Sequence, residues 1–212
     1  MKRLTRFNLR VNAAINSLLR CCPAMGRVAG GHDQKGTRVK VNLRFYDPAS
    51  DAALLPHLSA LLIEAVIAGA SIGFMADITE AEADAFWSAR FAAAARDECR
   101  LLLAFADDRL AGTVSLMTGT PPNQPHRADV SKMIVGRAFR EQGIGAALLA
   151  GVEAEARALG RTTLVLDTIS HSAAARLYER GGWQRIGEIA AYALMPDGAM
   201  APTTVYARYL GP

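Results

Sequence analysis

Cysteine and histidine are scarce in this chain, and the few present are scattered. The 212 residues include three cysteines and four histidines. The cysteines, Cys21, Cys22 and Cys99, form no CxxC pair and no cluster with histidine at the spacing of metal ligands. The sequence therefore predicts neither a disulfide framework nor a metal site. A reducing compartment is the simplest setting for such cysteines, so we expect a cytoplasmic protein.

Long apolar runs and an even spread of charge are also missing. No segment approaches the ~20 apolar residues that a membrane-spanning helix needs. Residues 1–40 hold nine Lys or Arg against the single acid Asp33, whereas residues 41–212 hold fifteen basic residues against nineteen acidic ones. The net charge of +4 therefore comes from the N-terminal part. Because the rest is slightly acidic, we expect no binding to nucleic acid.

The basic N-terminal part sets the expected domain organisation. We expect residues 1–36 to be a disordered extension or an overlong assigned start, and residues 37–212 to form one domain. A weak amphipathic helix for an anionic surface, or a transit-like segment, stays open as an alternative for the extension.

One local pattern stands out, a strand followed by a glycine-containing turn and a helix. Residues 126–135 are rich in β-branched and apolar types, and apolar residues recur at helical spacing after Gly143. The first helical turn offers unpaired N–H groups and the positive end of the helix dipole. Gly143 and Gly145 let a ligand approach the backbone, and Arg140 supplies a cation suited to phosphate. The turn therefore predicts a pyrophosphate site.

Two common nucleotide-binding patterns do not fit this turn. A dinucleotide fingerprint needs a third glycine three residues after the second, and that position is Leu148. A P-loop needs GxxxxGK followed by Ser or Thr, and the sequence has no such string. A glycine-containing helix start that binds no ligand stays open.

Strand and helix patterns alternate along the rest of the chain. Upstream we expect a strand at 38–47, a helix that ends at Gly69, a helix that begins with a Thr79 and Glu82 capping box, and a hairpin that turns at Asp107 and Asp108. Downstream we expect strand 126–135, the long helix, strand 162–168, helix 171–181 and two final strands. The order predicts one mixed β-sheet with helices on both faces.

The motif Arg140-x-x-Gly143-x-Gly145 resembles the acyl-CoA pyrophosphate loop of the GNAT superfamily of N-acetyltransferases. The segments "LVLDT" and "SAAARLYERGGW" are similar to the strand and helix that follow in that superfamily. With "GASIGFMADIT", "VSKMIV" and "MPDGAMAPTTVYARYL", the likeness extends to the tabtoxin-resistance acetyltransferases and covers residues 52–210. The sequence departs at Arg137, where proline is frequent, and at Glu141-Gln142, where Gly-Arg or Gly-Lys is usual.

The resemblance implies an α/β (α+β) fold of GNAT type, with about seven strands, and acetyl-CoA as the co-substrate. It places the cofactor against the end of a strand, the glycine turn and one arginine of the following helix. The implied cofactor-binding residues are Met133, Ile134, Val135, Arg140, Glu141, Gln142, Gly143, Ile144, Gly145, Ala146 and Arg176.

The resemblance also implies three catalytic residues. Transfer of an acetyl group to an amine needs a base, because free amines are mostly protonated near neutral pH. Asp129 and Asp167 lie on two strands that we expect to be parallel neighbours and close together, and we leave open which is the base. Tyr178 is the expected acid at the CoA sulfur. A surface ion pair for Asp129, a buried structural acid for Asp167 and simple packing for Tyr178 are the alternatives.

Phe74 and Met75, between two expected helices, are candidate walls of the acceptor site or ordinary interhelix packing. The leading function is an acetyl-CoA-dependent N-acetyltransferase for a small-molecule amine, such as an amino-acid-like toxin. Acetylation of a protein or peptide N-terminus, and a non-catalytic acyl-CoA sensor, are the alternatives. The sequence leaves the acceptor and a homodimer open.

Overall fold

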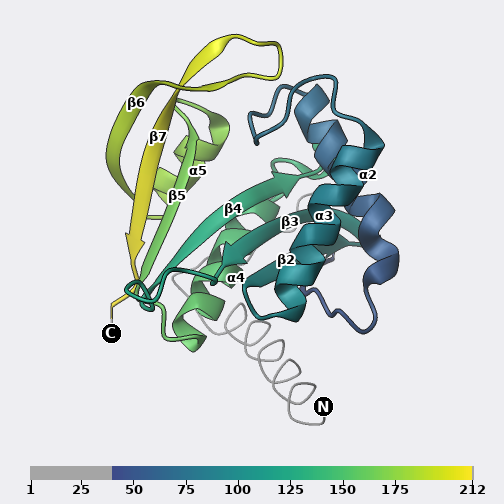
Figure 1. The fold of residues 1–212 in the computed structure, drawn as a ribbon, viewed down its shortest axis with the longest axis horizontal. Helices are drawn as coiled ribbons and strands as arrows, with labels where there is room; N and C mark the ends of the chain where they lie inside the picture. Colours follow the sequence, from purple (N-terminus) through teal and green to yellow (C-terminus); the bar gives the residue numbers. More distant parts are fainter. Residues whose placement is uncertain (1–39, 212) are drawn as a thin grey trace.

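A seven-stranded sheet organises residues 40–211, the part of the chain that the computed structural model describes (Figure 1). The strand order is β1-β2-β3-β4-β5-β7-β6, and only β4 and β5 pair in parallel. The strands are β1 Val41–Phe45, β2 Cys99–Ala106, β3 Arg109–Met117, β4 Arg127–Val135, β5 Thr163–Ile169, β6 Gln184–Leu194 and β7 Met200–Tyr209. The expected mixed sheet is confirmed. The predicted extension 1–36, with Cys21 and Cys22, lies outside the described residues.

Helices cover both faces of the sheet, as expected (Figure 1). They are η1 Ala52–Leu54, α2 Leu55–Ile67, α3 Glu80–Ala95, η2 Arg137–Phe139, α4 Ile144–Ala158 and α5 Ala173–Arg180. One core joins α2 and α3 to the sheet and contains Trp87, while the other joins α4 and α5 to the opposite face and contains Leu148. Leu103 of β2 belongs to the first core and its neighbour Leu102 to the second, because successive strand residues point to opposite faces.

Local signals in the sequence place several element boundaries. Thr79 and Glu82 form the expected capping box at the start of α3, with the Thr79 side chain accepting from the Glu82 amide at 3.2 Å. The β2–β3 hairpin turns at Asp107 and Asp108, whose φ angles are 46° and 65°. Positive φ at both central residues defines the tight turn whose twist matches the flanking strands.

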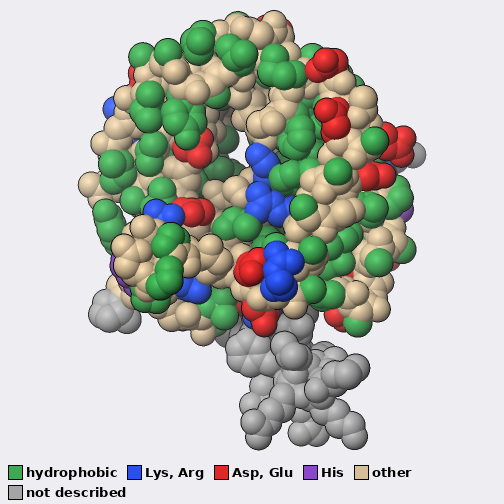
Figure 2. Space-filling view, in the orientation of Figure 1, with side chains coloured by type: hydrophobic (Ala, Val, Ile, Leu, Met, Phe, Trp, Pro, Cys, Tyr) green, Lys and Arg blue, Asp and Glu red, His purple; other side chains and the backbone are tan. Residues whose placement is uncertain are grey.

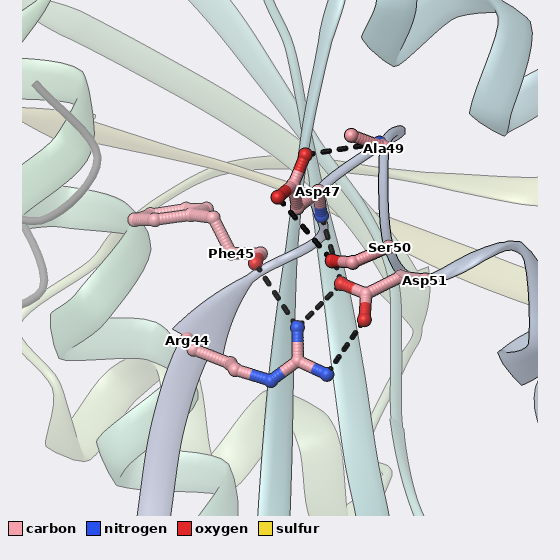
Figure 3. A network of polar contacts seen from close by, with 6 residues as sticks. All are labelled: Arg44, Phe45, Asp47, Ala49, Ser50 and Asp51. Carbon is pink, nitrogen blue, oxygen red and sulfur yellow. Dashed lines mark hydrogen bonds and ion pairs between the residues drawn. The ribbon is translucent and has the colours of Figure 1, made fainter. Parts of the chain in front are cut away.

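A charged pair ties β1 to the segment before α2 (Figure 3). The guanidinium of Arg44 donates to both carboxylate oxygens of Asp51, at 2.8 Å for Nη2 and Oδ1. Asp51 is buried, and its carboxylate also accepts from the Asp47 amide at 2.8 Å. The paired hydrogen bonds satisfy a carboxylate that would otherwise be costly to bury, and they fix where α2 begins.

A bulge in β4 reorients one side chain near the middle of the sheet. Thr113 of β3 pairs with Ile134 and Ser115 pairs with Ser131, so β4 holds one extra residue between these pairs. That residue is Lys132, whose φ is 51°. Strict alternation would point Lys132 to the α4 side with Val130, but the bulge turns it to the α2–α3 side.

β4 and β5 are paired only over their first residues. The parallel register covers Arg127–Asp129 and Thr163–Val165, and the described parts of β4 and β5 do not pair with each other beyond these residues. Beyond Asp129 the edge of β4 that faces β5 is therefore free of a partner strand, and its backbone groups are available to a ligand.

The β6–β7 hairpin docks on the segment between α2 and α3. The Ser71 hydroxyl donates to the carbonyl of Leu194 at 3.1 Å, and the Ala76 amide donates to the carbonyl of Pro196 at 3.0 Å. Two segments far apart in the sequence thus meet over the open end of the β4–β5 gap (Figure 1).

Candidate active site

The glycine turn presents a row of free amides at the start of α4. Gly143 is the N-terminal cap residue with a φ of 79°, a conformation that favours glycine. The backbone amides of residues 142–146 donate to no acceptor within residues 40–211, and the first turn of α4 holds no acidic side chain. Arg140 is exposed beside the turn, and its Nε donates to the Val135 carbonyl at 3.3 Å. The turn therefore fits an anionic group such as pyrophosphate.

Gly145 faces a neighbouring helix as well as the turn. A Cβ atom at Gly145 would lie 3.0 Å from Cδ2 of Leu177 in α5 and 3.9 Å from Cγ2 of Val135 in β4. The absence of a side chain therefore serves the approach of α5 to α4, in addition to the approach of a ligand. Ile144, by contrast, is buried in the core, and the side chain of Ala146 is exposed.

Three other predicted cofactor residues contribute in different ways. Glu141 is exposed, with a φ of 62°. The Gln142 side chain donates to the Ala138 carbonyl at 3.2 Å and so braces the turn itself. Arg176 is exposed in the first turn of α5, and its guanidinium donates to the His171 carbonyl at 2.9 Å. Among these three residues, Arg176 alone carries a positive charge that could attract a phosphate group.

The last residues of β4 lie along the unpaired part of the strand. Ile134 is buried in the α2–α3 core, whereas Met133 and Val135 are partly buried against the α4 core. Because the pairing of β4 with β5 ends at Asp129 and Val165, the backbone here borders the β4–β5 gap beside the glycine turn. An extended ligand can pair with such an edge as an added strand does.

The two predicted carboxylates are not opposite each other in the sheet. Asp129 pairs with Val165, so Asp167 lies two residues further along β5, where the strands no longer pair. The expectation that these two strands are parallel neighbours is confirmed. The carboxylates share the α2–α3 face but are offset by two residues along it, and their closeness stays a prediction. Asp129 forms an ion pair with Arg127, with 2.9 Å between Oδ2 and Nη2.

Asp167 is the freer of the two carboxylates. Its side chain is exposed and makes no hydrogen bond or ion pair with another described residue. A buried acid that caps backbone amides, the alternative considered from the apolar sequence around it, is therefore wrong. Its negative charge raises the pKa of Tyr178 and opposes the lowering of the pKa of Lys132. Asp167 thus faces the space that these two side chains border.

Tyr178 is a buried phenol next to this space. Its ring packs against Trp183 and Tyr206, with centroid distances of 5.8 and 5.9 Å. Burial, and then the negative charge of Asp167, raise the pKa of Tyr178 well above its usual value. The hydroxyl makes no hydrogen bond with the described residues and stays protonated at neutral pH, so it can donate to a ligand.

Phe74 and Met75 lie where the hairpin meets the α2–α3 segment. They line a cavity of about 400 Å³ together with Gly73, Ala193 and Leu194. Phe74 also packs edge-on against Phe86 of α3 at 5.4 Å, while Met75 is 40% exposed. Phe74 therefore packs between helices and also borders the cavity, and Met75 borders the cavity. The structure fits both the interhelix-packing and the cavity-wall interpretation of these residues.

Lys132 is a site residue that the sequence reasoning missed. Its ammonium donates to the Ile72 carbonyl and lies 5.7 Å from the ring centroid of Phe74. Burial, and then the positive charge of Arg90, lower the pKa of Lys132, while Asp167 opposes this shift. Figure 2 shows basic side chains at the centre of this face, below a hollow. A lone lysine in the apolar run "VSKMIV" was the available signal.

The comparisons with known proteins agree with this geometry. Residues 65–183 match the model of the Acetyltransferase (GNAT) family, and the chain belongs to that family. The prediction of an acetyl-CoA-dependent acetyltransferase of the GNAT superfamily is confirmed at the level of the family. No group of His, Cys, Asp or Glu suited to a metal ion occurs within residues 40–211, and no helix there is long and apolar enough to cross a membrane.

Solved structures with the same fold include enzymes with different acceptors. A proposed phosphinothricin N-acetyltransferase is 20% identical, with a TM-score of 0.67, and the match covers 82% of this chain and 100% of that one. The protein yncA of Salmonella typhimurium, solved with its cofactor acetyl-CoA, is 20% identical with a TM-score of 0.65 over 82% and 95% of the two chains. RimL, a ribosomal L7/L12 alpha-N-protein acetyltransferase in complex with coenzyme A, is 18% identical with a TM-score of 0.64 over 80% and 93%. The assignment to the tabtoxin-resistance subgroup stays a prediction.

Proposed function

We propose that this protein is an N-acetyltransferase that acetylates the amine of a small, amino-acid-like molecule, with acetyl-CoA as the donor. The observation that carries this proposal is the cavity at Phe74 and Met75, which forms where the α2–α3 segment is hydrogen-bonded to the β6–β7 hairpin. A cavity of about 400 Å³ that the docked hairpin partly covers suits a small acceptor, whereas a polypeptide tail needs an open groove. The resemblance to tabtoxin-resistance acetyltransferases supports the same class of acceptor, and we expect the enzyme to act in the cytoplasm.

Acetyl-CoA supplies the acetyl group as a thioester, and the described residues divide its binding between two places. The free amides of residues 142–146 and the exposed Arg140 bind the pyrophosphate. The edge of β4 at Met133 and Val135, which has no partner strand on the β5 side, binds the pantetheine as an added strand would be bound. This arrangement leads the thioester from the glycine turn into the β4–β5 gap, on whose borders Asp167 and Tyr178 lie.

Asp167 acts as the base in this proposal. Its carboxylate is exposed to the gap and unpaired within residues 40–211, whereas Asp129 already accepts from Arg127. Asp167 takes the proton of the acceptor ammonium, directly or through one water molecule, and frees the nitrogen lone pair for attack. Asp129 then serves to hold the Arg127 guanidinium beside the site.

Tyr178 acts on the leaving sulfur. The bond between nitrogen and the acetyl carbon forms, and the bond between that carbon and sulfur breaks. A thiolate leaves, and the Tyr178 hydroxyl donates a hydrogen bond or its proton to it. The raised pKa of Tyr178 keeps the phenol protonated until this moment. The second proton, which the nitrogen loses after the C–N bond has formed, replaces the proton that Tyr178 gives to sulfur, and the proton held by Asp167 returns to solvent.

A screen of acceptors tests the proposal. The full-length protein is incubated with acetyl-CoA and amino acids, aminoalkylphosphonates, aminoglycosides and peptides with free N-termini, and release of the CoA thiol is followed. We expect turnover with small amino-acid-like amines. Turnover of peptides alone would replace this function by N-terminal acetylation, the activity of RimL. Acetyl-CoA binding without turnover of any amine would favour a non-catalytic sensor.

A further inference from the structure

Two half-buried cations lie near each other on the α2–α3 side of the sheet. Lys132 of β4 and Arg90 of α3 both pack on the ring of Phe86, at 5.6 and 5.1 Å from its centroid. Neither forms an ion pair with a carboxylate of residues 40–211. The charge of Arg90 acts on Lys132 strongly enough to contribute to its lowered pKa. Two neighbouring like charges are unfavourable in a partly buried setting, and an anion between them would relieve this.

The backbone is shaped to hold Lys132 in this place. The β4 bulge gives this residue a φ of 51°, a left-handed conformation that is unfavourable for a residue with a side chain. The α2–α3 segment closes around its ammonium: a Cβ at Gly73 would lie 3.1 Å from Nζ, and the Ile72 carbonyl accepts from it. One carbonyl uses one of the three N–H donors, so two remain for a ligand.

We infer that Lys132 and Arg90 bind an anionic oxygen group of the acceptor, a carboxylate or a phosphonate-type group. This inference rests on the proposed function and narrows its substrate class to amines that carry an acid. Asp167 lies close enough for its charge to act on Lys132, so opposite charges border the same space. A zwitterion fits this pattern, with its ammonium toward Asp167 and its acid toward Lys132 and Arg90. Phe74, whose ring lies 5.7 Å from the Lys132 ammonium, also lines the cavity of about 400 Å³, which can take the remainder of such a molecule.

A simple structural role is the competing explanation. Lys132 could serve only to hold the α2–α3 segment through Ile72 and the aromatic rings. In that case the cation would stabilise the fold without distinguishing acidic acceptors from neutral ones. The tests below therefore compare acceptors that differ only in the acid, so that a loss of fold and a loss of recognition give different results.

The first test measures turnover of matched acceptor pairs by thiol release. The pairs are L-amino acids and their primary amides, with aminoalkylphosphonates as a separate arm that distinguishes the two kinds of acid. For the wild-type protein we expect kcat/KM for the preferred acid to exceed that for its amide by roughly ten- to a hundredfold, the worth of hydrogen bonds to a charged group. Lys132→Met should abolish this preference. Lys40→Met, which removes the same charge from an exposed position at the start of β1, should retain it.

The second test measures binding without catalysis. In protein labelled with nitrogen-15 at lysine and saturated with CoA, N-acetyl-L-methionine should shift the Lys132 signal and leave that of Lys40 unchanged. N-acetyl-L-methioninamide should leave both unchanged. Equal shifts with acid and amide, or no shift of Lys132 with any acid tested, would overturn the inference. So would an acid preference that survives in both Lys132→Met and Arg90→Met.

The two tests separate the inference from the proposed function. A shift of Lys132 by the acid, without turnover of any amine, supports the anion site and contradicts the acetyltransferase function for small molecules. Turnover of amides as fast as acids supports that function and contradicts the anion site. The melting temperature of Lys132→Met identifies a purely structural lysine. In that case the substitution lowers the melting temperature and leaves the acid-to-amide ratio of kcat/KM unchanged.

Discussion

Replacement of Gly145 by alanine separates the two reasons for a glycine at this position. The new Cβ would lie 3.0 Å from Cδ2 of Leu177, closer than ordinary van der Waals contact. Overpacking of this kind costs about 1 to 3 kcal/mol, toward the lower end here because the contact is with the flexible tip of a partly buried leucine. Replacing glycine in a helix by alanine contributes about 1 kcal/mol in the opposite direction. We therefore expect the free energy of unfolding to change by no more than about 1 kcal/mol, or a few degrees in melting temperature.

The affinity for acetyl-CoA should respond much more strongly. A methyl group in the first turn of α4 keeps the pyrophosphate from one or two amides, and each hydrogen bond to a charged group is worth about 1.5 to 3 kcal/mol. Calorimetry should therefore show a dissociation constant raised by roughly ten- to a hundredfold. Gly145→Glu, which adds a negative charge at the same place, should abolish binding.

Gly160→Ala is the matched control for this experiment. Gly160 follows α4 at its other end, has a φ of 69° and has no atom within 4 Å of its potential Cβ. The variant should lose about 1 kcal/mol of stability to backbone strain and bind acetyl-CoA as the wild type does. Wild-type affinity in Gly145→Glu would refute the placement of the pyrophosphate. A fall in affinity that only parallels a fall in stability for Gly145→Ala would mean that Gly145 serves helix packing alone.

Further predictions concern the base, the acid and the fold. Asp167→Asn should lower kcat by roughly a hundredfold or more with acetyl-CoA binding intact, and Asp129→Asn by less than tenfold; equal losses would contradict the division of roles. Tyr178→Phe should keep the melting temperature, because the hydroxyl makes no hydrogen bond with the described residues, and lower kcat by roughly ten- to a thousandfold; full activity would leave Tyr178 a packing residue. Asp51→Asn breaks the buried ion pair with Arg44, so it should lower the free energy of unfolding in denaturant by about 1 to 3 kcal/mol. The affinity for acetyl-CoA should change little, because the pair is not part of the glycine turn. An unchanged denaturation midpoint would contradict this role of Asp51.

The sequence predicted the elements whose causes are local. The capping box of Thr79 and Glu82 and the turn at Asp107 and Asp108 depend on a few adjacent residues, and both have the expected form. The glycine turn before α4 is local in the same sense, because its free amides follow from one helix start. Such features depend on backbone preferences that each short segment carries with it.

The site was harder to predict because it depends on register. Whether Asp129 and Asp167 face each other is decided by the register of β4 against β5, which sets Asp129 opposite Val165, and neither strand alone carries that information. Lys132 was missed for a related reason. Alternation from Val130 would point Lys132 toward α4, and only the pairing of β4 with β3 shows the extra residue that turns it to the other face.

The docking of the β6–β7 hairpin has a consequence for how such an enzyme can diversify. On the hairpin side, the two hydrogen bonds that hold it to the α2–α3 segment end on main-chain carbonyls, those of Leu194 and Pro196. Every amino acid has a main-chain carbonyl, so substitutions at the hairpin tip can change the chemistry of the cavity wall without breaking these two hydrogen bonds. The scaffold can thus exchange one acceptor for another by point substitution in a segment whose position is fixed by its backbone.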